Sequence, residues 1–133
     1  PGDPLRVARL GRGSAVGDLD GDLDLDVVMV DADGPLVVLE NVGARGDALS
    51  IELTATRSSP DAIGAEVTVT CGGRRHVQQR TSPIGYLSSS DPRLHFGLGD
   101  CPTVDAVEVR WPSGGTERLS RVPANQLVRI VER

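Results

Sequence analysis

Five aspartates at every second position form the stretch whose residue types and spacing best fit a chemical role. They are Asp18, Asp20, Asp22, Asp24 and Asp26, within Gly17 to Val30, GDLDGDLDLDVVMV. Carboxylates this close together disfavour one another's ionised forms. A calcium ion removes that repulsion, because it takes roughly 6–8 oxygen ligands that a tight loop supplies from alternate positions. The spacing predicts calcium bound by the carboxylates of Asp18, Asp20, Asp22 and Asp26 and by the carbonyl of Asp24.

The residue types of this loop argue against other kinds of metal site. The stretch contains neither His nor Cys, so zinc and the softer transition metals fit poorly. The helical calcium-binding hand requires a bidentate Glu at position twelve, which here is Met29. Leu23 occupies position six, where Gly usually eases the bend, although Gly21 lies two residues before it. The alternative without a metal is a solvated acidic turn, and the position-specific spacing favours calcium.

The acidity of the chain is local to this loop. The chain has 133 residues, with 19 acidic and 14 basic side chains, and the five loop aspartates account for the whole excess. The main basic cluster, Arg74, Arg75, His76 and Arg80, has no aromatic stacking platform beside it. We therefore expect no nucleic-acid partner. No apolar run approaches the roughly 18 residues of a membrane span.

Alternating apolar and polar residues predict an all-β fold. The alternation covers residues 49–55, 65–71, 94–98 and 107–111, and further strands are expected near 116–122 and 126–131. Gly72-Gly73 predicts a two-residue hairpin turn. We predict an antiparallel β-sandwich in which Trp111 and Phe96 are the largest core residues.

Residues 1–43 predict a smaller unit in front of that sandwich. Residues 5–10 are expected to form a first strand, and VVMV and LVVLE a hairpin over 27–40. Such a partial propeller blade cannot bury both faces alone, so it must pack on the rest of the chain, a partner or further blades. The polar link NVGARGD, residues 41–47, predicts the boundary between a unit 1–43 and a unit 44–133. It contains Arg45-Gly46-Asp47, the tripeptide of integrin ligands, which also arises easily by chance.

The two cysteines, Cys71 and Cys101, leave two alternatives open. In an oxidising compartment they would pair, closing a 30-residue loop and stabilising the fold by ~3 kcal/mol. Alternatively, Cys71 packs as a small apolar group, because it shares the parity of Ala65, Val67 and Val69.

The residue types of a hydrolase are present without its motif. Ser88, Ser89, Ser90, His76 and His95 could in principle supply a nucleophile and a base. The sequence has no G-x-S-x-G nucleophile elbow, and His95 lies on the polar side of its predicted strand. We therefore expect His95 at the surface or at a sheet edge, and no enzymatic activity.

The order of the motifs is similar to that of a known family. The segment GRGSAVGDLDGDLDLDVVMVDADGPLVVLEN resembles the last FG-GAP/VCBS-type repeat of a calcium-binding propeller. It is followed by TRSSPDAIGAEVTV, GYLSSSDPRLHFGLGD and VDAVEVRWPSGGTERL, a succession that resembles the ASPIC/UnbV domain. This family includes secreted cartilage acidic proteins and the UnbV proteins of enediyne gene clusters. The resemblance implies a non-catalytic role and calcium in the aspartate loop.

Two functions follow as expectations. The first is an extracellular, calcium-binding interaction module whose partner is a protein or a glycan. The alternative is an accessory protein of enediyne biosynthesis that binds an apolar small molecule. That alternative needs a concave and mostly apolar pocket, which we would place near Tyr86 and Leu87.

Overall fold

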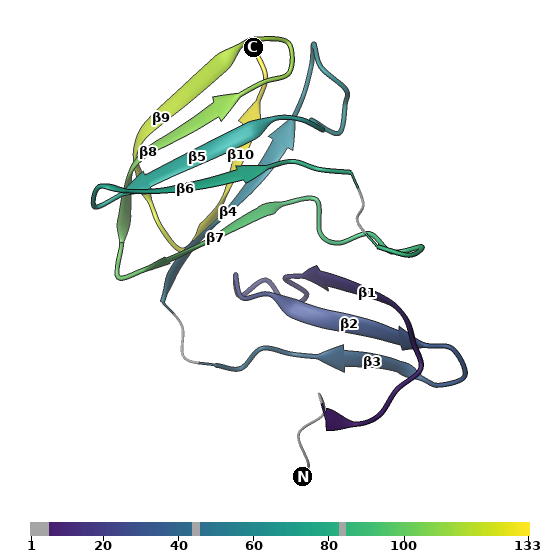
Figure 1. Ribbon diagram of the computed structural model, residues 1–133. Helices are drawn as coiled ribbons and strands as arrows, with labels where there is room; N and C mark the ends of the chain where they lie inside the picture. The colour runs from purple at the N-terminus through teal and green to yellow at the C-terminus, as the bar shows by residue number, and fades with distance from the viewer. Residues whose placement is uncertain (1–5, 44–45, 83–84) are drawn as a thin grey trace.

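A computed structural model describes residues 6–43, 46–82 and 85–133, and its regular elements are all strands (Figure 1). The strands are β1 (Gly11–Gly17), β2 (Asp26–Asp31), β3 (Leu36–Leu39), β4 (Asp47–Thr54), β5 (Glu66–Cys71), β6 (Arg74–Gln79), β7 (Leu94–Gly99), β8 (Thr103–Arg110), β9 (Thr116–Pro123) and β10 (Gln126–Val131). The all-β prediction is confirmed. Among the described residues, no helix has the length and apolar character needed to cross a membrane.

Strands β4 to β10 form the sandwich. One sheet has the order β10-β4-β7 and the other the order β6-β5-β8-β9. The inward-facing residues of both sheets join in one core, in which Trp111 and Phe96 are the largest side chains, as predicted. Val67 lies opposite Val109 in the β5–β8 pair, so the period-two pattern of each strand directs its apolar set to the same face.

One strand pair departs from the predicted antiparallel arrangement. β10 runs parallel to β4, with Gln126 beside Leu49 and Val131 beside Thr54. The reason is that β9 lies in the opposite sheet, so the chain crosses between sheets before β10 begins. Asn125 fixes the crossing: its amide donates to the Ala48 carbonyl (2.6 Å), and the Ala48 amide donates to its side-chain oxygen (3.1 Å).

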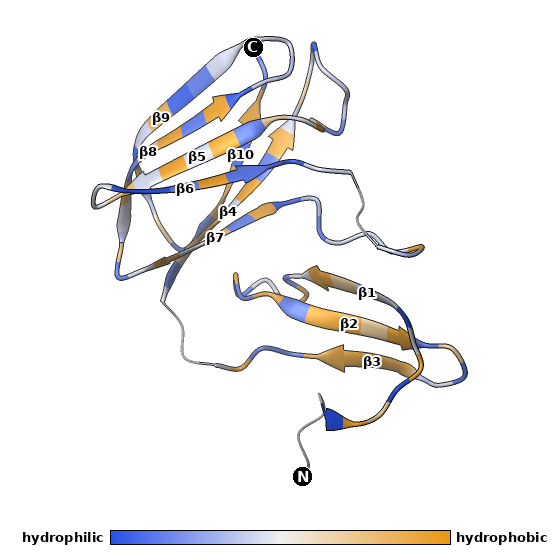
Figure 2. Cartoon of the chain, viewed as in Figure 1, coloured by the Kyte–Doolittle hydropathy of each residue, from blue (hydrophilic) through white to orange (hydrophobic). Residues whose placement is uncertain are grey.

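Strands β1, β2 and β3 form a separate antiparallel sheet in that order, hereafter the N-terminal sheet. Its first strand is residues 11–17, so the prediction of a strand at 5–10 is wrong. GRGSAVG has little intrinsic strand preference, and pairing with β2 determines its conformation. Figure 2 shows that β2 and β3 are apolar along most of their lengths, unlike the alternating strands of the sandwich. Val30, Leu36 and Val38 remain 45%, 61% and 52% exposed.

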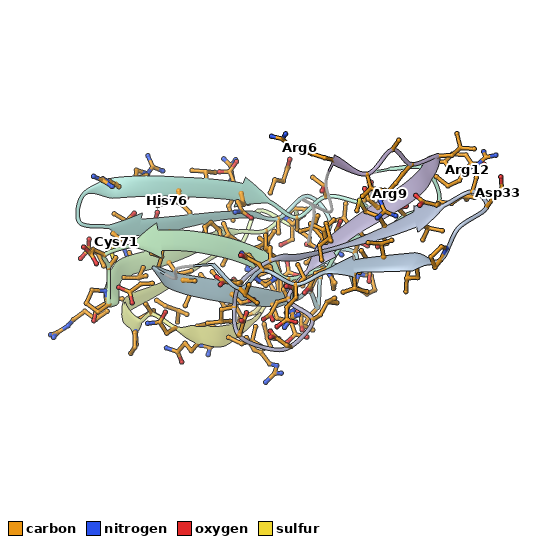
Figure 3. All side chains as sticks on the ribbon, turned by 90° about the horizontal axis from the view of Figure 1, so that it is seen from below. Arg6, Arg9, Arg12, Asp33, Cys71 and His76 are labelled. Carbon is orange, nitrogen blue, oxygen red and sulfur yellow. A yellow bond between two sulfur atoms is a disulfide. The ribbon has the colours of Figure 1, made fainter. Side chains whose placement is uncertain are left out.

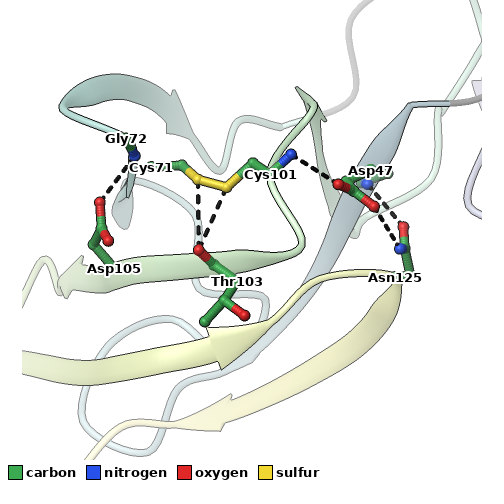
Figure 4. Close-up of a disulfide and its surroundings, with 8 residues drawn as sticks. Asp47, Cys71, Gly72, Cys101, Thr103, Asp105 and Asn125 are labelled. Carbon is green, nitrogen blue, oxygen red and sulfur yellow. Dashed lines mark hydrogen bonds between the residues drawn. A yellow bond between two sulfur atoms is a disulfide. The ribbon is translucent and has the colours of Figure 1, made fainter.

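Cys71 and Cys101 form a disulfide (Figure 4). This resolves the open alternative in favour of pairing. The bond joins the end of β5 to the loop in which the chain passes from β7 in one sheet to β8 in the other. The Cys101 amide also donates to the Asp47 carboxylate at the start of β4 (2.7 Å).

Glu132, immediately after β10, is a buried carboxylate that closes the other end of the sandwich. Its Oε2 accepts hydrogen bonds from the backbone amides of Thr56, Arg57 and Ser58, at 2.8–2.9 Å. The hydroxyl groups of Ser58 and Ser113 donate to its Oε1. Burial raises the pKa of Glu132, but these hydrogen bonds outweigh it and lower the pKa to about 2.

Candidate functional site

The aspartate loop connects β1 to β2, and Asp18 organises it. The Asp18 side chain is 1% exposed. Its Oδ1 accepts hydrogen bonds from the amides of Gly21 (2.7 Å) and Asp22 (3.1 Å), and its Oδ2 accepts one from Leu23 (3.2 Å). Asp18 therefore holds the loop in a tight turn around its own carboxylate.

Three of the five predicted ligands lie together. Carboxylate oxygens of Asp18, Asp20 and Asp22 all lie within 4.8 Å of one another. These three residues supply only hard oxygen donors, which suits calcium better than zinc. This grouping agrees with positions one, three and five of the predicted loop. Among the described residues, Asp24 and Asp26 are not part of the group.

Asp26 instead closes the base of the loop. It is 2% exposed; its Oδ2 accepts a hydrogen bond from the Leu19 amide and its Oδ1 one from the Asn41 amide, both at 2.9 Å. The bonds from Asn41 and Leu19 lower the pKa of Asp26. These two hydrogen bonds therefore favour the ionised form of Asp26, which is the form that a metal ligand requires.

Leu23, at position six of the loop where glycine is usual, has an unusual backbone conformation. Leu23 adopts a left-handed conformation with φ of 73°, and Gly21 does so with φ of 83°. For a residue with a Cβ, this conformation costs roughly 1–2 kcal/mol. The loop keeps the geometry that a glycine would favour, with leucine in its place.

Arg93 joins this loop to the sandwich, and sequence reasoning missed it. Its guanidinium donates to the Asp18 carbonyl (3.0 Å) and lies 4.0 Å from the Asp18 carboxylate. Asp91 holds the same guanidinium in a two-pronged ion pair. Arg93 and Asp18 are 75 residues apart, so no local signal identifies the contact.

Backbone contacts complete the junction between the N-terminal sheet and the sandwich. The Asp91 amide donates to the Val16 carbonyl (2.9 Å), and the Val16 amide donates to the Ser90 hydroxyl (3.1 Å). A Cβ at Gly17 would lie 3.0 Å from that of Asp91, so any larger residue there would require Asp91 to shift. Burial raises the pKa of Asp91, but hydrogen bonds from Arg93 outweigh it and lower the pKa to about 2.

His95 is more buried than the sequence indicated. Its side chain is 9% exposed, and its Nε2 lies 3.5 Å from Asp91. It faces away from the core on β7, but the aspartate loop covers that face, and Leu23, Asp24 and Leu25 line the adjacent crevice. The expected position at a sheet edge is confirmed, since β7 is an outer strand of its sheet. The covering of that edge was not predicted, because the covering segment is distant in sequence.

The remaining candidates for catalysis do not converge in the described part of the chain. Ser88 and Ser89 donate their hydroxyl groups to nearby backbone carbonyls, and Ser90 accepts from Val16. His76 lies on β6, opposite Val69. Arg45 of the Arg-Gly-Asp tripeptide lies outside the described residues.

Comparison with known proteins gives consistent matches. A family model described as ASPIC and UnbV matches residues 55–133. Cartilage acidic protein 1 of Homo sapiens is 35% identical over 119 residues, which cover 86% of this chain and 18% of that protein. The Mus musculus protein is 35% identical over 131 residues, which cover 95% of this chain and 20% of that protein. The Xenopus tropicalis protein is 33% identical over 119 residues, which cover 86% of this chain and 18% of that protein. This chain spans about a fifth of the length of these curated relatives.

Proposed function

This chain belongs to the ASPIC and UnbV family, and from that premise we propose that it is a non-catalytic, calcium-binding interaction module. The observation that carries the proposal is the close grouping of Asp18, Asp20 and Asp22. Calcium there would be held by these carboxylates, with the Asp24 carbonyl and Asp26 completing the set as the spacing predicts. The ion would fix the loop and strengthen the N-terminal sheet.

We further propose two units with different roles. Residues 1–43 act as an FG-GAP/VCBS-like partial blade, and residues 44–133 as the ASPIC/UnbV-like sandwich. The exposed apolar residues Val30, Leu36 and Val38 support this division, because such a surface on a small sheet suits a covering partner. We assign that covering to further blades of the same type. The partner of the whole module is a protein or a glycan.

The disulfide supports an extracellular location. Disulfides persist in oxidising compartments and are rare in the cytosol. Cys71 and Cys101 are both buried, and their bond joins β5 to the loop between β7 and β8, as expected for a structural disulfide. We therefore place the module outside the cell.

Calcium titration of the purified chain tests the proposal. We expect heat on calorimetric titration with calcium chloride and a higher melting temperature. At one hundred times the dissociation constant, the gain in unfolding free energy is about 2.7 kcal/mol. Asp20→Asn and Asp22→Asn should each weaken binding, whereas Asp61→Asn, on an exposed residue of a distant loop, should not.

Two outcomes would contradict the metal site. One is the absence of both heat and thermal shift when calcium is added to chelator-treated protein. The other is equal binding by the Asp20 and Asp61 variants. A glycan array probed with and without calcium then tests the partner, with binding expected only when calcium is present.

A further inference from the structure

A cavity of about 550 Å³ lies beside the N-terminal sheet, at the end away from the aspartate loop. We propose that it binds an organic carboxylate, with the acid group on Arg12 and the carbon body against Met29 and Tyr86. This volume falls in the range of roughly 300–1,000 Å³ that is typical of small-molecule sites. The cavity shares no residue with the aspartate group, so this proposal does not depend on calcium.

A β-bulge places Arg12 at the cavity. Gly11 pairs with Asp31 and Gly13 with Val30, so Arg12 is the extra residue of β1 with no partner opposite. Bulges re-aim side chains and are frequent beside binding sites. Figure 3 shows Arg9 and Arg12 at the same end of the molecule, the end that also carries Asp33. The backbone irregularity therefore presents a cation to the cavity.

The charges around the cavity favour an anion. Arg9 donates to the Asp31 carboxylate at 3.0 Å, so these two charges compensate each other. Arg12 makes no ion pair within the described residues, which leaves one positive charge on the lining. A planar guanidinium binds carboxylate oxygens through two parallel hydrogen bonds. A carboxylate is the simplest group that uses this geometry.

The rest of the cavity wall suits the apolar part of a ligand. Tyr86, which the sequence placed near a small-molecule pocket, lines the cavity and is 66% exposed. Met29 also lines the cavity, and its flexible thioether adapts to irregular shapes. Leu87 does not line the cavity. The ring face of an acidic sugar and the chain of a fatty acid both offer the required surface, so the experiment must distinguish them.

Gly11 provides a way to block the site. It lines the cavity, and a Cβ built there meets no atom within 4 Å. Its φ is not in the left-handed region, so a larger side chain is accepted by the backbone. Gly11→Leu should therefore reduce the free volume without unfolding the sheet.

The test uses the ring proton NMR signals of Tyr86, which is the chain's single tyrosine. The probes are sodium glucuronate and sodium octanoate, with glucose and octanol as their neutral counterparts. We expect the carboxylates to shift the Tyr86 signals and the neutral compounds to leave them unchanged. The carboxylate that binds more tightly shows whether the ligand is an acidic sugar or a fatty acid.

Three variants sharpen the test. Arg12→Met keeps the side-chain length and removes the charge, and it should weaken carboxylate binding by about tenfold or more. Gly11→Leu should abolish binding, while Arg75→Met, on exposed β6, should leave it unchanged. The proposal is overturned if neither carboxylate shifts Tyr86 up to about 10 mM, if the neutral compounds bind equally, or if Arg12→Met binds normally while its melting temperature is unchanged.

Discussion

The sandwich and the N-terminal sheet are stabilised by different chemistry. All 17 buried residues of the hydrophobic core lie between Leu49 and Ile130. In residues 6–43 the buried positions are Gly17, Asp18 and Asp26, two of which are carboxylates that bind backbone amides. The sandwich is held by apolar burial, whereas the N-terminal sheet is held by charge-assisted hydrogen bonds and by its contacts with Asp91 and Arg93. The sandwich has its own core, whereas the N-terminal sheet depends on its contacts with the sandwich.

Loss of the disulfide should have the largest effect on this contrast. In the chain-entropy model, a closed loop of 30 residues stabilises the fold by about 3–4 kcal/mol. The double variant Cys71→Ala/Cys101→Ala should lose that amount of unfolding free energy in urea titrations. Hydrogen exchange should show the loss in β5 and β8, with the amides of the aspartate loop unchanged. A loss below about 1 kcal/mol would contradict the prediction.

A matched pair of valines tests the contrast directly. Val69 is 0% exposed in the sandwich, and Val38 is 52% exposed in the N-terminal sheet. Val69→Ala should cost about 2–3 kcal/mol, because it removes buried methyl groups and leaves a cavity. Val38→Ala should cost less than about 0.5 kcal/mol. Equal costs in urea unfolding would show that a covering surface already buries Val38.

Relief of the strain at Leu23 should strengthen the weaker region. Leu23→Gly removes a left-handed Cβ penalty and should stabilise the folded loop by about 1 kcal/mol. If the left-handed conformation is a minor one before calcium binds, the calcium affinity should rise by up to about fivefold. The matched control is Leu25→Gly, where φ is not positive and the same change should destabilise the protein. Reduced affinity in the Leu23 variant would show that the ion selects another conformation.

Protonation of Asp91 should have the smallest effect, and it should act on the junction. The pKa of Asp91 is lowered to about 2 in the folded protein. Its full contribution to the free energy of unfolding is therefore present at pH values above the pKa of the unfolded state, about 3.9. That contribution is lost as the pH falls towards 2. Because the pair is partly exposed to solvent, the change should stay below about 1 kcal/mol.

Arg93 and His95 both lie beside Asp91, and Arg93 also lies 4.0 Å from the Asp18 carboxylate, so the readout must identify the group that titrates. The Arg93 Nε–H signal should move with the titration of Asp91 in NMR spectra recorded between pH 5 and pH 2. Asp91→Asn should remove this dependence. Persistence of the signal change in that variant would assign it to another carboxylate.

The sequence predicted the sandwich better than its surroundings. Period-two patterns correctly located the strands that contain Leu49, Val67, Phe96 and Val109, because burial of one face is a local signal. The sequence pattern misplaced the first strand, because the conformation of GRGSAVG is set by pairing with β2. The parallel β10 and the covering of His95 were also missed, since both depend on contacts between distant segments.

In the candidate site too, local features were predicted from the sequence and long-range contacts were not. The grouping of Asp18, Asp20 and Asp22 follows from spacing within one loop and was predicted. The role of Asp26 at the base of the loop depends on Asn41, and the contact of Arg93 depends on the docking of the whole sheet. Local spacing therefore identifies ligands, whereas the residues that position them require the tertiary structure.

The pairing of β10 with β4 has a consequence for biosynthesis. The pairing partner of Leu49 is Gln126, 77 residues later in the chain, and the backbone amides after β4 bind Glu132. During translation, the central strand β4 therefore has an open edge until β10 leaves the ribosome. Non-local pairing of this kind slows folding and lengthens the exposure of unpaired strands. The newly made chain should therefore need protection by chaperones until residue 132 has emerged.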